Sequence, residues 1–313
     1  MNIRETKEFH LAEGFIMRNA RPLDMAMWRY LFHGGNREDV LEALAAFQNP
    51  DGGFGWGLEC DSMNPNSSPI QTLTACGALR EIGFTDGSHP IVQGVLRYLD
   101  SGADFDEKSG QWLTVVPSNN DYPHAIWWAF DPNSKPEDNP LPYNPTAGLA
   151  GFALRFADKN SGLYRKSEGI AMNAIAFITS GEFPPEIHVT GSFAMLYDYL
   201  VEAGAEQFNT DKLRETLLSR AESEICRDSS RWETEYVPKP SNYIQNRSSL
   251  FYAGNEALCK AECELIRSSQ QPDGSFPVTW QWCTEYQEFA LAANWWKSRF
   301  IITNMRFLAE FGE

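Results

Sequence analysis

Hydrophobic residues recur along most of the chain at the three- and four-residue spacing of a single helix face. They do so from Val40 to Phe47, from Ile91 to Leu99 and from Leu213 to Ala221. Because one helical turn takes 3.6 residues, this spacing predicts amphipathic α-helices with one face toward water. Alternating strand patterns flanked by turn residues are almost absent, so the sequence predicts no major β-sheet.

Two further stretches, residues 69–79 and 146–154, are apolar nearly all round and carry no charge. This composition predicts buried helices. Ser68-Pro69 and Asn144-Pro145 each place an N-cap residue and a helix-starting proline just ahead of them. We therefore expect an all-α protein in which amphipathic and buried helices alternate.

A seven-residue motif occurs twice, each time after an amphipathic helix. Residues 48–54 read QNPDGGF and residues 270–276 read QQPDGSF. Asp-Gly supplies a tight turn, since glycine takes positive φ without penalty, and the following aromatic residue can pack between neighbouring helix pairs. Weaker echoes end on an aromatic residue at Ser109–Trp112, Ser161–Tyr164 and Ser230–Trp232. Such repetition indicates helix pairs that stack on one another.

The motif resembles the QW-type repeat of squalene-hopene and oxidosqualene cyclases and of prenyltransferase β-subunits, with Phe where the cyclases usually have Trp. The resemblance implies an α/α-toroid, a barrel of about five to six pairs of inner and outer helices around a central cavity. We expect one such domain over residues 1–313. The zinc site of the prenyltransferases is not matched, because Cys283 lacks an Asp two residues before it and a His after it.

Composition narrows the classes of function. Hydrophobic residues make up 42% of the chain and aromatic residues 13%, as in a globular protein with a sizeable core. The net charge of −16 and the lack of a basic run argue against nucleic-acid partners. A polar start and the absence of a long apolar run predict a cytoplasmic protein without a transmembrane segment.

The six cysteines include no Cys-x-x-Cys pair, so we expect free thiols. We expect no cofactor and no bound metal. The oligomeric state is open.

The first candidate site follows the first strong repeat, where Glu59 and Asp61 precede the predicted buried helix. They resemble half of the Asp-x-Asp-Asp motif with which squalene cyclases protonate an alkene or epoxide. Such chemistry requires a carboxylic acid held neutral in an apolar cavity. Alternatively, both side chains accept hydrogen bonds from loop amides or from a helix start.

Aromatic residues gather in two further clusters. The first surrounds His124, a candidate general acid or base, and contains Trp127, Trp128 and Tyr143. Together with Trp56, these rings can stabilise a cation, stack on sugars or fill a core.

The second aromatic cluster follows the last strong repeat. It contains Trp282, Glu285, Tyr286 and Trp295, which we assign to substrate binding. Glu285 and Glu288 are spaced to share a helix face, from which they can act with Asp61 across a closed ring.

Three functions fit these observations. The first is a terpenoid-cyclase-like protein that binds an apolar isoprenoid in its cavity and starts cyclisation by proton transfer from Asp61 or Glu59. The second is a carbohydrate hydrolase or lyase, because α/α-toroids also serve glycan enzymes and a Trp-rich acidic cleft suits sugars. The third is a non-catalytic binding protein with a degenerate site. The partner we expect is a small, apolar substrate molecule.

Overall fold

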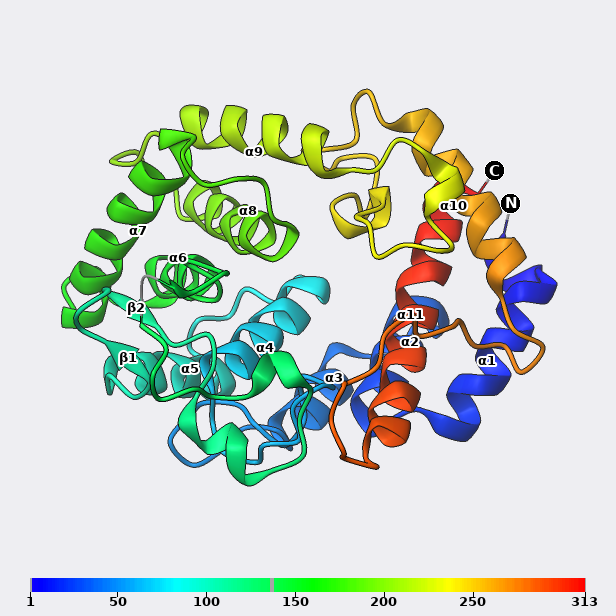
Figure 1. The fold of residues 1–313 in the computed structure, drawn as a ribbon, viewed down its shortest axis with the longest axis horizontal. Coiled ribbons are helices and arrows are strands. Elements are labelled where there is room, and N and C mark those ends of the chain that lie inside the picture. The colour runs from blue at the N-terminus through cyan, green and yellow to red at the C-terminus, as the bar shows by residue number, and fades with distance from the viewer. Residues whose placement is uncertain (1, 136–137, 313) are drawn as a thin grey trace. The chain divides into compact units, whose positions relative to one another are not determined.

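The structure of the chain, a computed structural model, describes residues 2–135 and 138–312. It is mostly helical, with 56% of residues in helices and 3% in strands, as the hydrophobic spacing predicts (Figure 1). The α-helices are α1 (Lys7–Asn19), α2 (Pro22–His33), α3 (Arg37–Ala45), α4 (Pro69–Glu81), α5 (Pro90–Asp100), α6 (Thr146–Phe156), α7 (Gly162–Ser180), α8 (Ile187–Glu202), α9 (Thr210–Glu224), α10 (Glu256–Ser269) and α11 (Phe289–Phe311). A two-residue strand β1 (Phe105–Asp106) pairs antiparallel with β2 (Gln111–Trp112). Short 3₁₀ turns span Ile3–Glu5, Pro117–Asp121, Ile126–Trp128, Ser229–Arg231 and Pro240–Asn242.

The chain divides into two compact units. The terminal unit joins Met1–Leu44 to Ala221–Glu313, and the central unit is the continuous segment Ala45–Arg220. Each has its own buried apolar side chains. The expectation of one domain over residues 1–313 stays a prediction.

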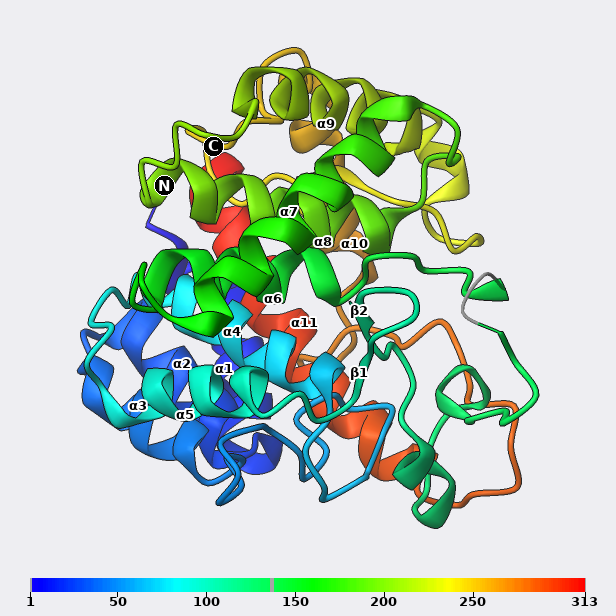
Figure 2. The same ribbon diagram turned by 90° about the vertical axis from the view of Figure 1, so that its left-hand side faces the viewer.

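In the central unit, α6 packs against α4, α5, α7 and α8. Figures 1 and 2 show α4, α6 and α8 in one layer, with α5 and α7 in a second layer beside it. Every α6 side chain from Thr146 to Leu154 is buried, which confirms the helix predicted there. No α4 side chain is exposed either, and residues 69–79 of this helix are the uncharged stretch that predicts burial.

In the terminal unit, α11 packs against α1, α2 and α10 (Figure 1). The core between α1 and α2 is aromatic. Phe9 stacks on Trp28 with ring centroids 4.8 Å apart, and Phe32 lies 4.5 Å from the same indole. Large aromatic side chains supply much of the buried apolar area in such a core.

The two strong repeats form the same loop, one in each unit. Gln48 Nε2 donates to the carbonyl of its turn glycine at 2.9 Å and to that of Ile91, in the first turn of α5, at 3.0 Å. Gln270 Nε2 makes the matching bonds, to its turn glycine at 3.2 Å and to Glu8, in the first turn of α1, at 2.9 Å. The conserved spacing of the motif therefore has a physical cause, because each glutamine ties its loop to the start of a helix.

The turn glycines of these loops allow a close approach of two backbones. Gly52 has φ 97° and Gly274 has φ 94°. A Cβ at Gly52 would lie 2.1 Å from the carbonyl oxygen of Gly94, and one at Gly274 would lie 1.9 Å from that of Leu11. Only glycine fits at either position. The structural role predicted for the Asp-Gly turn is confirmed.

The weaker echoes differ from one another. The amide of Trp112 donates to the hydroxyl of Thr146 at 2.9 Å, as the amide of Phe54 donates to that of Thr72 at 3.1 Å. Each bond joins an aromatic residue of a repeat to the start of a helix. Tyr164 lies inside α7, so that echo is a helix start and not a loop.

The two predicted helix caps have different outcomes. The Ser68 side chain accepts from the amide of Gln71, so this N-cap is confirmed. Asn144 is not an N-cap, because Pro145 holds that position and α6 begins one residue later than predicted. The Asn144 carbonyl accepts from the Thr114 hydroxyl at 2.6 Å, which ties the residues before α6 to the segment that follows β2.

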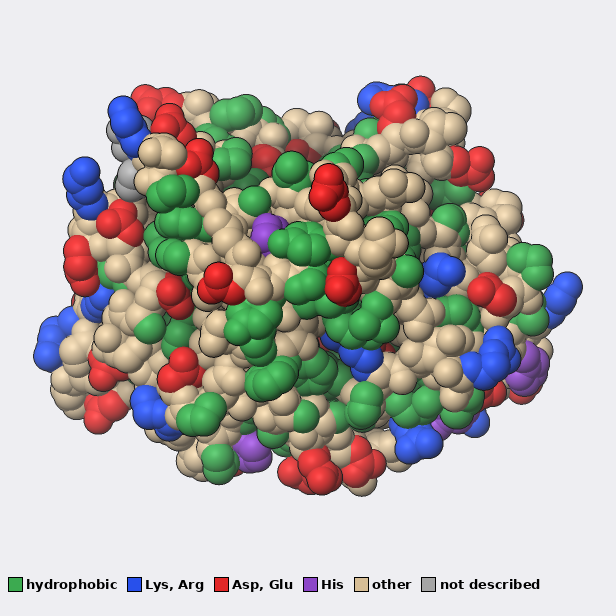
Figure 3. Space-filling view, turned by 60° about the horizontal axis from the view of Figure 1, so that its bottom comes forward, with side chains coloured by type: hydrophobic (Ala, Val, Ile, Leu, Met, Phe, Trp, Pro, Cys, Tyr) green, Lys and Arg blue, Asp and Glu red, His purple; other side chains and the backbone are tan. Residues whose placement is uncertain are grey.

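Among the residues described, none of the helices combines the length and apolar character that crossing a bilayer requires. The face drawn in Figure 3 shows acidic and basic side chains interspersed with hydrophobic ones.

Candidate functional site

Glu59 and Asp61 lie in the loop between the first repeat and α4, in the central unit. Gln71 on α4 positions this loop, because its Oε1 accepts from the amides of Leu58 and Glu59, at 2.8 Å and 3.4 Å. Glu59 is half-buried and its carboxylate accepts from the amide of Asp61 at 3.3 Å. Asp61 is only 3% exposed. Glu59 therefore accepts a hydrogen bond from a loop amide, which is the alternative to an acid catalyst that was predicted for it from the sequence.

The structure brings His124 to the same place. The amide of Ala125 donates to the Asp61 carbonyl at 2.9 Å, and the amide of Met63 donates to that of Pro123, also at 2.9 Å. These bonds pair the backbone of residues 61–63 with that of residues 123–125, with Ser62 opposite His124. The segments that carry Glu59, Asp61 and His124 therefore lie side by side.

His124 is buried, and its ring orientation is fixed by the backbone. Its Nδ1 lies 2.7 Å from the carbonyl oxygen of Tyr122. A carbonyl only accepts, so the neutral ring carries its proton on Nδ1 and has Nε2 as the basic nitrogen.

Two buried amides support these paired segments, and no pattern in the sequence predicts them. Asn64 Nδ2 donates to the hydroxyl of Ser118 at 2.8 Å and to Oδ1 of Asn119 at 2.9 Å. Asn119 Nδ2 in turn donates to the carbonyl of Trp128 at 3.0 Å. The partners are more than fifty residues apart in the sequence. No local pattern signals such a contact.

The aromatic residues predicted to bind substrate in the central unit have different environments. Trp56 is 58% exposed and Trp127 is 43% exposed, whereas Trp128 and Tyr143 are half-buried. The Trp56 indole donates to Oδ1 of Asn49 at 2.9 Å, which fixes an exposed ring. Tyr143 packs against other aromatic rings, with its centroid 5.1 Å from that of Phe177 and 5.9 Å from that of Phe193, so it serves the core as well.

The third cluster belongs to the terminal unit. Trp282 is 1% exposed and its ring lies 6.0 Å from that of Phe289. Tyr286 is exposed. Trp295 is half-buried under the guanidinium of Arg21, which lies 4.6 Å from its ring centroid.

The predicted pairing of Glu285 and Glu288 on one helix face is wrong. Helix α11 begins at Phe289, with Glu288 as its N-cap, and both glutamates are exposed. Glu285 lies in the preceding loop, so the two residues share no helical turn. Residues three positions apart share a face only within a helix, and the chain from Glu285 to Glu288 precedes the helix.

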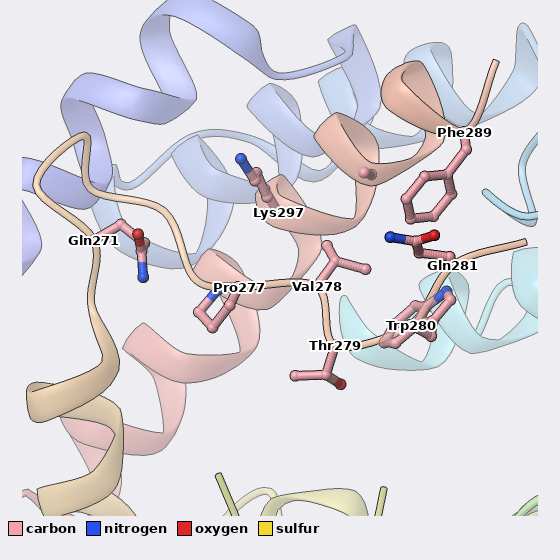
Figure 4. Close-up of a pocket in the computed structure, with 9 residues that line it drawn as sticks. Gln271, Pro277, Val278, Thr279, Trp280, Gln281, Phe289 and Lys297 are labelled. Carbon is pink, nitrogen blue, oxygen red and sulfur yellow. The ribbon is translucent and has the colours of Figure 1, made fainter. Parts of the chain in front are cut away.

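A groove in the terminal unit offers space for a ligand. Its volume is about 470 Å³, within the range of roughly 300–1,000 Å³ that is usual for small-molecule sites. The segment from Pro277 to Gln281 runs beside α11 and forms one wall, while Phe289 and Lys297 come from α11 and Gln271 from the repeat loop (Figure 4). The lining residues are Gln271, Pro277, Val278, Thr279, Trp280, Gln281, Phe289, Ala293 and Lys297.

The aromatic wall of the groove is held by further rings. Trp280 lies edge-on to Trp296, with centroids 5.3 Å apart, and to Phe300 at 5.7 Å. Tyr236, 71% exposed, lies edge-on to the same indole at 6.4 Å. The packing fixes the Trp280 ring in the groove wall without help from a ligand. Of the residues assigned from the sequence to substrate binding, none lines this groove.

The repeat loop brings an acidic group near the groove. Burial alone would raise the pKa of Asp273, but the pKa is lowered because the amide and hydroxyl of Ser275 donate to the carboxylate and Lys297 is close by. The two bonds from Ser275 measure 2.9 Å and 2.7 Å. Asp273 is therefore ionised at neutral pH and bound into its own turn.

All six cysteines are free thiols, and five of them are wholly or partly buried. Burial raises the pKa of Cys259 to about 12 and that of Cys263 to about 11, so both thiols are protonated at neutral pH. Over the part of the chain that the structure describes, no three His, Cys, Asp or Glu side chains are grouped to hold a metal ion.

Comparison with known proteins identifies no relative: no family model matches the chain, and neither a curated protein nor a solved structure is similar to it.

Proposed function

We propose that the chain binds a small, largely apolar molecule of the isoprenoid class in the groove between residues 277–281 and α11. The groove itself supports this proposal, because its walls include the side chains of Pro277, Val278, Trp280, Phe289 and Ala293. Burial of apolar area contributes about 25 cal/mol per Å², so a branched hydrocarbon gains affinity along such walls. Rigid aromatic side chains add little ordering cost on binding.

Catalysis would require groups from elsewhere. The described lining contains no carboxyl group, so this groove offers no acid of the kind that starts cyclisation. We therefore propose binding without catalysis for this groove, and Asp61, in the central unit, is the candidate acid of a separate site. An Asp61→Asn variant that keeps its fold and loses product formation would support that reaction, and unchanged product formation would remove Asp61 from it.

For the arrangement of helices we propose the α/α-toroid. The support is the repeat loop, because two copies 222 residues apart dock through the same glutamine bonds onto the first turn of a helix. Repeating contacts of this kind are typical of stacked helix pairs.

The binding proposal is tested by calorimetric titration of the purified protein with a C15 isoprenoid alcohol. We expect binding to the native chain and loss of binding in Ala293→Phe, which fills the groove from α11. Ala290→Phe is the matched control, because Ala290 is exposed on the same helix and does not line the groove. Equal binding by both variants would rule out this groove.

A carbohydrate site is the second candidate, and the two exposed indoles of the central unit favour it. Trp56 and Trp127 present ring faces on which sugar C–H groups can stack. Oligosaccharide binding that is lost in Trp56→Ala and kept in Ala293→Phe would favour this function. Failure to bind a broad glycan panel would exclude it.

A further inference from the structure

Lys297 distinguishes the groove from a purely apolar site. Among the nine lining residues, it alone carries a charge, and Gln271 and Gln281 add two neutral amides. Lys297 is half-buried on α11. The net charge of the chain is −16, so the positive charge of Lys297 is opposite in sign to the overall field of the protein.

The Lys297 ammonium is available to a ligand. It makes no hydrogen bond, and no ion pair within 4.0 Å, with the residues that the structure describes. Its acidic neighbour Asp273 is turned to Ser275, which donates both its amide and its hydroxyl to the same carboxylate oxygen. The groove therefore combines an apolar wall with a single unpaired positive charge.

We propose that the natural ligand of this groove is an apolar carboxylic acid, bound as its anion with the carboxylate at Lys297 and the hydrocarbon against Trp280 and Phe289. This inference rests on the proposed function and adds the class of head group. A single lysine with two amides matches one negative charge. A diphosphate carries more charge than this lining offsets, and the negative field of the chain disfavours it further.

Three ligands with the same C15 hydrocarbon test the head group: farnesol, farnesoic acid and farnesyl diphosphate. We expect the acid to bind native protein about tenfold more tightly than the alcohol, as one charge-assisted hydrogen bond provides, and more tightly than the diphosphate. Lys297→Gln should abolish the preference for the acid without weakening binding of the alcohol. Lys297→Arg should keep the preference.

The control is Lys260→Gln, which removes one positive charge from an exposed position on α10 away from the groove. It should leave the preference unchanged. If native protein binds the alcohol and the acid equally, or binds the diphosphate best, the carboxylate inference is wrong while the binding proposal stands. If none of the three binds, both are wrong.

Discussion

The close approach of the second repeat loop to α1 predicts a large effect for a small change, Gly274→Ala. The added methyl group would lie 1.9 Å from the carbonyl oxygen of Leu11, in the backbone of α1, and no side-chain rotation relieves that contact. The loop would have to move away from α1. That movement breaks the bond between Gln270 and Glu8.

The magnitude has two parts. A left-handed conformation costs an L-residue about 1–2 kcal/mol, and the lost hydrogen bond costs about 0.5–1.5 kcal/mol more. We expect Gly274→Ala to lower the free energy of unfolding by about 3 kcal/mol once the separation of loop and helix is included. Gly254 is the matched control, because it has φ 85° in the same unit and nothing lies within 4 Å of its added Cβ. Gly254→Ala should show only the backbone cost, about 1–2 kcal/mol.

Urea unfolding of both variants, followed by circular dichroism, measures the difference. Because both glycines belong to the terminal unit, the same transition reports on them. Equal losses of stability would mean that the close contact with α1 does not exist, and the explanation of the repeat motif would fail with it.

Three further predictions follow from contacts in the structure. Gln48→Glu, which keeps the shape but removes the donor to two carbonyls, should cost about 1–3 kcal/mol by chemical denaturation, and a neutral effect would contradict the role given to this residue. In the folded protein, burial raises the pKa of Glu262 above its ordinary 4.5. The free energy of unfolding of the native protein should therefore fall, relative to that of Glu262→Gln, as the pH rises from 4.5 through the raised pKa. If the free energies of unfolding of the two proteins change in parallel over that range, this prediction is wrong. A thiol reagent at neutral pH should label the exposed Cys283 at once, but Cys259 and Cys263 only when the protein unfolds. Mass spectrometry of the labelled peptides measures this difference. Rapid labelling of Cys259 or Cys263 in the folded protein would show that these thiols are not buried.

The sequence predicted those parts of the fold that depend on neighbouring residues. Helical spacing located α3, α5 and α9, and uncharged stretches located α4 and α6. The Ser68 cap and the Asp-Gly turns were predictable because the interactions that form them lie within a few residues. The cap at Asn144 was predicted wrongly because α6 begins one residue later than the Asn-Pro pattern indicates, with Pro145 at the N-cap.

The candidate sites were less predictable, for the same reason. Glu59, Asp61 and His124 were chosen for their chemistry, and only the backbone pairing of residues 61–63 with residues 123–125 places their segments side by side. The groove could not be found from periodicity, because its wall at residues 277–281 is irregular and its shape depends on packing against α11. Long-range contacts between irregular segments produce no regular spacing of hydrophobic residues in the sequence.

The bond between Gln270 and Glu8 joins residues 262 positions apart, and this has a consequence for synthesis on the ribosome. The central unit is one continuous segment and can fold as soon as residue 220 has emerged. Helix α1 is made before the central unit, and the loop that docks on it is made after the central unit. Helices α1 and α2 must therefore wait for α11 and the second repeat loop, which pack against them, until after the whole central unit has been made. During that interval the nascent chain is most exposed to aggregation and to capture by chaperones.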